Sequence, residues 1–243
     1  MTKYESWMLA ASWFTAVGTL GAVVFAMFSA ALKRWVNSPK LTFHISEAIP
    51  NCNLVSGCNP QVGNRSFDFI EGCGYVQNSK RYCAKSCQVM CDEIFVLDAD
   101  GRKFCQFKKI RPRQFPWVDA EEGAHIPIDI PQSLHRYVKV FEIKNVKEIP
   151  SAPFGPVASH SQNATQIVVC LMIGKDYIRI PSEYRSIILP IVITSSGMKP
   201  INEYIRVDWK GGSVKEISDP GKLKVSKLFE KDFREITNMK KEG

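Results

Sequence analysis

The chain has 243 residues, of which 45% are hydrophobic and 23% are charged, and its formal net charge is +8. This apolar fraction excludes a disordered protein, because a disordered chain has too few apolar side chains to bury a core. The positive charge favours anionic partners, which are either lipid headgroups or nucleic acid.

The N-terminal part of the chain has the features of a membrane helix. No residue from Ser6 to Leu32 is charged, and as a helix these 27 residues would span roughly 40 Å, more than the roughly 30 Å of bilayer hydrocarbon. The apolar part of a signal peptide is much shorter. We therefore predict a short tail over residues 1–5 and an uncleaved transmembrane helix over residues 6–35, and we favour this over a cleavable signal peptide or a buried helix.

Basic residues beside the predicted helix indicate its orientation, because positively charged flanks stay in the cytoplasm. Only Lys3 precedes the helix, whereas Lys33, Arg34 and Lys40 lie at its end or follow it. We expect a single-pass protein of the inner (cell) membrane whose C-terminal domain is cytoplasmic.

Small residues recur along the same helix. Gly18, Ala22, Ala26 and Ala30 are spaced four apart, which places them on one helix face that a second backbone could approach closely. Self-association through this face would explain the pattern, and so would chance, because small residues are common in membrane helices.

After a linker over residues 36–40, alternating apolar and polar residues predict a β domain over residues 41–221. Within it, Asn, Gly, Ser and Pro predict a loop over residues 48–66, and a second long connection covers residues 147–164. The fold class is mainly β: an N-terminal transmembrane α-helix followed by an antiparallel β-sandwich, immunoglobulin-like or barrel-like. The strand-like runs lie within residues 41–48, 67–78, 87–101, 125–130, 137–143, 166–173, 184–194 and 203–212.

Two finer expectations concern the end of the chain and one proline. Residues 222–243 change to a helical period, which predicts an amphipathic helix and a tail that docks on the β domain. The apolar positions that recur there are Val225, Leu228, Phe229, Phe233 and Ile236. Pro190 should lie at a bulge or on an edge strand, because proline cannot donate a hydrogen bond to a ladder.

Eight cysteines allow two interpretations. In the cytoplasm they would be free thiols that pack as small apolar side chains, whereas in an exported domain they could form disulfides. Around Cys87 and Cys91 the sequence is rich in β-forming residues, so we expect a strand that places both thiols on one face. Zinc is disfavoured, because no Cys-x-x-Cys pair occurs. The cysteines are Cys52, Cys58, Cys73, Cys83, Cys87, Cys91, Cys105 and Cys170.

The sequence contains none of the Gly-x-Ser-x-Gly, His-Glu-x-x-His, P-loop or Gly-x-Gly-x-x-Gly motifs. The four histidines are far apart in the sequence, and nothing pairs one of them with a cysteine as a nucleophile. We expect no enzyme activity, no catalytic residue, no cofactor and no metal site. The histidines are His44, His125, His135 and His160.

A basic segment, "GRKFCQFKKIRPR" at residues 101–113, combines six positive charges with Phe104 and Phe107 and contains no acid. We favour a solvated edge strand whose charges prevent pairing with other chains, then contact with anionic lipid, then binding of nucleic acid with the phenylalanines stacked on bases. The six residues are Arg102, Lys103, Lys108, Lys109, Arg111 and Arg113.

Three stretches carry a resemblance to a known group of proteins: "LKRWVNSPKLTF", "YVQNSKRYCAKSCQV" and "RPRQFPWVD". With them the chain resembles, over roughly residues 13–145, a set of uncharacterised bacterial membrane proteins that have one N-terminal transmembrane helix and a cytoplasmic β-sandwich domain. Cys73 and Gly74 stand where this pattern would place β-branched residues. The resemblance implies the fold and the cytoplasmic side, and it implies no chemistry.

These observations lead us to expect a membrane-anchored, non-enzymatic binding or scaffolding module. Its expected partners are the lipid bilayer, a second copy through the transmembrane helix and a protein ligand, with nucleic acid ranked behind them. One alternative is a membrane-tethered sensor or effector that binds nucleic acid or a nucleotide through residues 102–113. Another is an exported, disulfide-bonded binding domain.

Overall fold

The computed structural model describes residues 3–36, 38–48, 52–59, 65–97, 104–118, 126–145, 165–173, 176–180 and 184–238. Its elements in chain order are α1 (Lys3–Val36), β1 (Leu41–His44), β2 (Cys52–Asn59), β3 (Arg65–Asn78), β4 (Ala84–Leu97), β5 (Phe104–Gln114), β6 (Ile128–Ile130), β7 (His135–Asn145), β8 (Thr165–Ile173), β9 (Asp176–Arg179), β10 (Ser186–Thr194), β11 (Ile201–Trp209), α2 (Val214–Ile217), β12 (Leu223–Leu228) and α3 (Glu230–Asn238).

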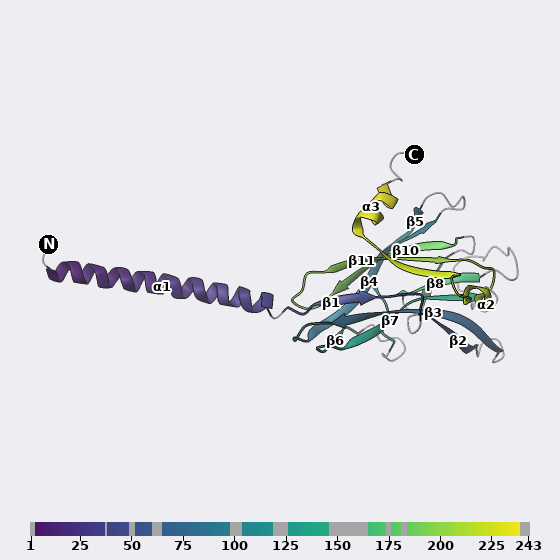
Figure 1. The fold of residues 1–243 in the computed structure, drawn as a ribbon, viewed down its shortest axis with the longest axis horizontal. Helices are drawn as coiled ribbons and strands as arrows, with labels where there is room; N and C mark the ends of the chain where they lie inside the picture. Colours follow the sequence, from purple (N-terminus) through teal and green to yellow (C-terminus); the bar gives the residue numbers. More distant parts are fainter. Residues whose placement is uncertain are drawn as a thin grey trace.

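Helix α1 extends away from the β domain as a separate rod (Figure 1). Its segment Ser6–Ser29 is 24 residues long and apolar enough to cross a membrane, judged by length and composition. The large apolar side chains described along it, such as Trp13, Phe14 and Phe25, are exposed rather than packed on the domain. The chain is thus mainly β, with one N-terminal apolar helix.

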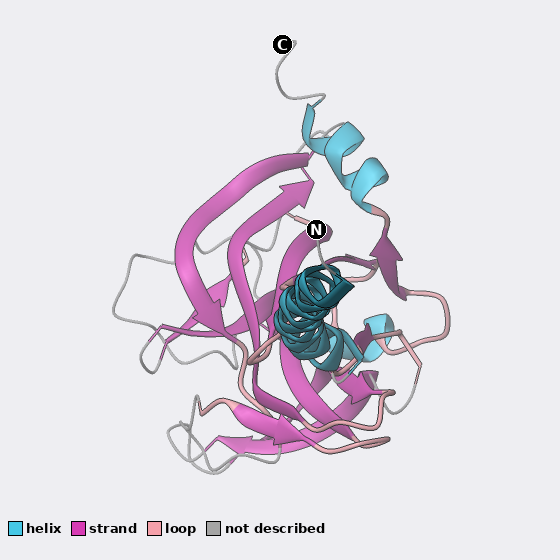
Figure 2. Ribbon diagram, turned by 90° about the vertical axis from the view of Figure 1, so that its left-hand side faces the viewer, coloured by secondary structure: helices cyan, strands magenta, loops and turns pink. Residues whose placement is uncertain are grey.

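The strands form two antiparallel sheets. In the first sheet the order is β1-β3-β7-β8-β9, and β2 also pairs with β3. In the second sheet the order is β12-β11-β10-β4-β5, and β6 also pairs with β4. Strands of both sheets curve around a common interior when the molecule is viewed from the side of α1 (Figure 2).

One apolar core lies between the sheets. Phe43 and Phe141 of the first sheet and Val89, Val207 and Trp209 of the second belong to the same buried cluster. The period of two explains this, because every second side chain points inward from Cys87 to Cys91 in β4 and from Ile205 to Trp209 in β11. The inward positions on β4 include Cys87 and Cys91, which confirms the strand expected for this segment.

Two glycines make room for aromatic rings in this core. A Cβ atom at Gly74 would lie 2.2 Å from Cζ of Phe43, and one at Gly72 would lie 2.3 Å from Cζ of Phe141. No side chain fits at such distances unless the ring moves. Glycine at these positions of β3 therefore has a packing reason, which explains why Gly74 replaces the β-branched residue that the pattern led us to expect.

Hydrogen bonds join the two sheets on both sides. On one side Phe115 N donates to Val89 O of β4 (2.8 Å), and Lys139 N of β7 donates to Pro116 O (3.0 Å), so the segment after β5 bridges the sheets. On the other side Lys227 Nζ of β12 donates to Phe43 O of β1 (2.9 Å).

Two segments differ from the sequence expectations. Strand β2 lies inside the expected loop 48–66, because backbone pairing with β3 compensates for the weak strand propensity of its Asn and Gly residues. Residues 223–228, expected as the start of the C-terminal helix, form β12 on the edge of the second sheet, and the helix begins at Glu230. Val225 and Leu228 therefore belong to a strand.

The docking of the C-terminal helix and the bulge at Pro190 are confirmed. Phe233 of α3 stacks on Tyr204, with ring centroids 4.2 Å apart, and lies edge-on to Phe95. Burial under this helix raises the pKa of Tyr204. The register between β10 and β4 shifts between Ile188 and Val192, so the proline lies opposite an irregularity although β10 is not an edge strand.

Asn78, at the end of β3, holds three segments together. Its fully buried side chain donates from Nδ2 to Tyr82 O (2.6 Å) and Ile130 O (3.0 Å), and Oδ1 accepts from Lys80 N (3.2 Å). Its backbone N–H donates to Leu134 O (3.1 Å). The β3–β4 turn is therefore tied to the β6–β7 turn.

Replacing Asn78 by Ala should lower the free energy of unfolding by about 2–4 kcal/mol, because two carbonyls and one amide lose their partner. Chemical denaturation of the full chain in detergent measures this. Ser79→Ala removes only an exposed 3.3 Å bond to Lys40 O and should change the free energy by less than about 0.5 kcal/mol. Equal effects of the two changes would contradict the role given to Asn78.

Candidate functional site

A pocket with a volume of about 580 Å³ lies at the end of the second sheet that carries α2. Four neighbouring strands, β4, β10, β11 and β12, contribute to it. Ser186 at the start of β10 lies opposite Asp208 near the end of β11, which in turn lies opposite Lys224 of β12. The volume is in the range of pockets that bind small molecules. We call it the cationic pocket, and it is lined by Leu97, Arg185, Ser186, Arg206, Asp208, Trp209, Lys210, Gly211, Gly221, Lys222 and Lys224.

Five of the lining side chains are basic and one is acidic. Strand alternation explains the placement, because Ile205, Val207 and Trp209 face the core while Arg206 and Asp208 lie on the opposite face. The remaining basic residues come from the ends of the strands and from the segment after α2.

Asp208, the one acid among the described lining residues, is already paired. Arg206 Nε lies 3.0 Å and 2.9 Å from the two carboxylate oxygens of Asp208, and Ser186 Oγ donates to the same carboxylate. The Arg206 guanidinium also lies 5.0 Å from the centre of the Phe104 ring, which holds it in place. Among the described lining residues, this arrangement has an excess of positive charge that an anionic ligand would neutralise.

Sequence reasoning missed this pocket, although the alternation of apolar and polar residues within 203–212 puts Arg206, Asp208 and Lys210 on one face of a strand. Arg185 and Lys222 line the same pocket from the positions just before β10 and β12. The sequence did contain a relevant pattern. The turn-rich stretches "WKGG" and "DPGKLK" flank residues 213–218, and they could have indicated that one strand ends and its neighbour begins at the same end of the sheet.

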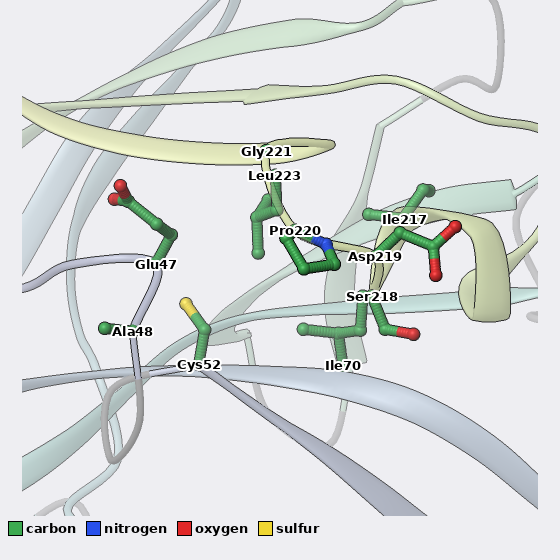
Figure 3. A pocket seen from close by; sticks show the side chains of 10 residues that line it. All are labelled: Glu47, Ala48, Cys52, Ile70, Ile217, Ser218, Asp219, Pro220, Gly221 and Leu223. Atoms are coloured by element: carbon green, nitrogen blue, oxygen red, sulfur yellow. The ribbon is translucent and has the colours of Figure 1, made fainter.

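A second pocket, of about 380 Å³, is drawn in Figure 3, and Gly221 lines both this pocket and the cationic pocket. Its surface is formed by Cys52 and Ile70 from the first sheet and by the segment from Ile217 to Leu223. Glu47 lies at its rim, where its carboxylate accepts from Val225 N (3.3 Å). The thiol of Cys52 donates to Ser46 O (3.1 Å) and points into this region.

Helix α2, whose Ile217 lines the second pocket, is stabilised by its own cap. Ser213 Oγ accepts from Glu216 N (3.2 Å), and the Glu216 carboxylate accepts from N of Gly212, the residue before the N-cap (2.6 Å), in a variant of the capping box. Val214 and Ile217 of this helix are buried. The segment that carries Lys210 and Lys222 is therefore tied to the core.

The buried cysteines do not have the properties of nucleophiles. Burial raises the pKa of the Cys52, Cys73 and Cys91 thiols to about 12 and that of Cys87 to about 11. These thiols are protonated at neutral pH, whereas nucleophiles and metal ligands are thiolates. All six cysteines that the structure describes are free, and Cys83 is the exposed one among them, while the side chains of Cys58 and Cys170 lie outside the described residues.

The basic segment is an edge of the second sheet, as far as its residues are described. Lys108, Lys109, Arg111 and Arg113 are exposed on β5, and Arg102 and Lys103 lie outside the described residues. The phenylalanines are not available for stacking on bases. Phe104 is buried, and Phe107 packs against the core and lies edge-on to Tyr184.

The other candidate residues are placed as follows. Gly18, Ala22 and Ala26 lie on the exposed surface of α1, and the side chain of Ala30 is outside the described part. His44 stacks on Tyr75, with ring centroids 4.9 Å apart, and His135 packs against Tyr75 and Tyr137. His125 and His160 are not among the described residues. Within the part of the chain that is described, no three His, Cys, Asp or Glu side chains are grouped to hold a metal ion.

No family model, no curated protein and no solved structure matches this chain.

The raised thiol pKa values predict a specific loss of stability at alkaline pH. The Cys91 thiol has a pKa of about 12 when folded, against 9.0 for an ordinary thiol, so its contribution is present below pH 9 and is lost as the pH rises toward 12. The difference in unfolding free energy between wild type and Cys91→Ala should therefore shrink above pH 9, by up to about 1.4 kcal/mol per pH unit. Denaturant titrations at several pH values measure it, and a difference that stays constant would contradict the burial of a protonated thiol.

Proposed function

We propose that the chain is a membrane-anchored, non-enzymatic binding module whose cationic pocket takes a small anionic ligand, such as one carrying phosphate groups. In this proposal α1 crosses the inner membrane once, and the β domain is a sandwich on the cytoplasmic side. The observation that carries the ligand class is the pocket itself, in which five basic side chains surround one carboxylate that is already paired.

Anchoring is supported by the exposure of α1. A helix with Trp13, Phe14 and Phe25 exposed to water would be unfavourable, and each large apolar side chain transferred to hydrocarbon contributes about 1.5–3 kcal/mol. The cytoplasmic side is supported by Lys33, Arg34 and Lys40 at the C-terminal end of the helix. Free thiols at the six described cysteines agree with a reducing compartment.

The proposal favours binding over catalysis. The buried thiols of Cys52, Cys73, Cys87 and Cys91 are protonated, and the described residues that line the cationic pocket include no histidine or cysteine. It also favours the cationic pocket over the basic segment as the ligand site, because a pocket surrounds a ligand from several strands whereas β5 presents its charges along one edge.

Orientation is tested with a C-terminal tag on the full chain in a bacterial host. In spheroplasts, added protease should leave the tag intact, and it should remove the tag once the inner membrane is permeabilised, because the domain is on the cytoplasmic side. Cleavage before permeabilisation would place the domain outside the cytoplasm and favour the exported alternative.

Ligand binding is tested with pyrophosphate as the probe, by calorimetry on the full chain in detergent at low salt. We expect binding in the range of about 10 μM to 1 mM. The double variant Lys222→Glu, Lys224→Glu should weaken it by at least about 100-fold, because two charge-assisted contacts become repulsive.

The matched control is Lys80→Glu, Arg81→Glu, which changes the net charge equally at exposed residues outside the cationic pocket. This variant should bind pyrophosphate like wild type. If both variants lost binding to the same extent, the probe would be responding to net charge, and the proposal of a ligand pocket would be overturned.

A further inference from the structure

Four segments form the end of the β domain that lies toward α1, namely residues 38–40, 79–85, 131–134 and 195–200. We call this the α1-proximal end. Figure 1 shows β1, the start of β11 and β6 on the side from which α1 projects, and α2 on the opposite side. The nine residues of β11 run from one end to the other, a distance of roughly 27 Å.

Every charged residue in these four segments is basic. The five side chains are all exposed, and they come from the linker, the β3–β4 turn, the start of β4 and the β10–β11 turn. They are Lys40, Lys80, Arg81, Lys85 and Lys199. Just outside the segments, the carboxylate of Asp129 accepts a hydrogen bond from Ser86 N (2.8 Å).

Exposed apolar side chains accompany these charges. Tyr82 in the β3–β4 turn is 41% exposed, and Leu134 in the β6–β7 turn is 49% exposed. Tyrosine is enriched at the level of lipid headgroups, where its ring is buried and its hydroxyl reaches water. Basic residues around such side chains are the composition of a surface that contacts anionic lipid.

Hydrogen bonds hold the four segments in one arrangement. Ser79 N donates to Lys40 O (3.0 Å), which ties the linker to the β3–β4 turn, and Asn78 ties that turn to the β6–β7 turn. Ser196 N and Ser195 Oγ both donate to Lys85 O (2.8 Å each), which adds the β10–β11 turn. The charges are therefore carried by a fixed surface rather than by separate loops.

We infer that the α1-proximal end binds the anionic lipid headgroups of the membrane that α1 crosses, and so holds the β domain against the bilayer with the cationic pocket facing away from it. This inference rests on the anchoring proposed above. The charge pattern supports this inference. Only a few residues separate α1 from β1, so this end of the domain is the one held close to the headgroups. Membrane attachment through α1 alone would require neither the basic residues nor their fixed arrangement.

The experiment uses the full chain with a fluorophore on Cys83, the exposed thiol of the β3–β4 turn. The chain is reconstituted into neutral phosphatidylcholine vesicles and into vesicles with about 30% phosphatidylserine, both containing a lipid with a nitroxide on its headgroup. Labelled Cys83→Ser gives the background from other thiols. Quenching should increase about twofold with anionic lipid and return to the neutral value at about 1 M salt, where charges are screened within ~3 Å.

The double variant Lys80→Glu, Arg81→Glu should abolish the increase in quenching. The double variant Lys222→Glu, Lys224→Glu changes the net charge equally at the far end of the domain, and it should retain the increase. Flotation with neutral vesicles at high salt reports the anchor separately. Chain that does not float would overturn anchoring by α1. Chain that floats but shows the same quenching in both vesicles would overturn lipid binding by this end and leave the anchor intact.

A nucleic acid is the competing occupant of this basic end. A fluorescent oligonucleotide that binds the chain in neutral vesicles, and fails to bind Lys80→Glu, Arg81→Glu, would overturn the assignment to lipid. Circular dichroism of each variant should match wild type, because the substituted side chains are exposed.

Discussion

The hydrogen bonds of the buried Asn78 side chain are the constraint on which the organisation of the β domain depends. A buried amide must satisfy its donors and its acceptor, and at this position the partners are backbone groups of the β3–β4 turn and of the last residue of β6. A change in either segment would leave a polar group without a partner in the interior. The linker joins the same arrangement, because Ser79 N, next to Asn78, donates to Lys40 O.

The length and stiffness of β10 and β11 separate the two basic regions of the domain. Both strands pair on each side along most of their length, and their inward side chains lie in the common core. One end of this pair carries the turn of the α1-proximal end, and the other end carries the cationic pocket. In the proposed arrangement one region contacts the bilayer while the other remains open to the cytoplasm, and no hinge is needed between them.

The buried cysteines pack in the core as small apolar side chains. Cys87 and Cys91 occupy inward positions of β4 that valine or alanine could fill, and burial keeps their thiols protonated. A reducing compartment preserves such thiols, so the thiols and the proposed orientation agree.

The glycines of β3 also contribute to core packing. Because Gly72 and Gly74 have no side chain, they leave the space that the rings of Phe141 and Phe43 occupy.

Properties carried by local periodicity could be predicted from the sequence: the long apolar helix, the strand with Cys87 and Cys91 inward, the alternating β11 and the docked helix around Phe233. Their signal lies in neighbouring residues, whose spacing decides which side chains share a face. Strand β2, strand β12 and the cationic pocket could not be predicted in this way. The two strands exist because their backbones pair with β3 and β11, and the pocket exists because strand register brings Arg185, Arg206 and Lys222 together. Pairing partners and register are long-range properties, so only the tertiary structure decided them.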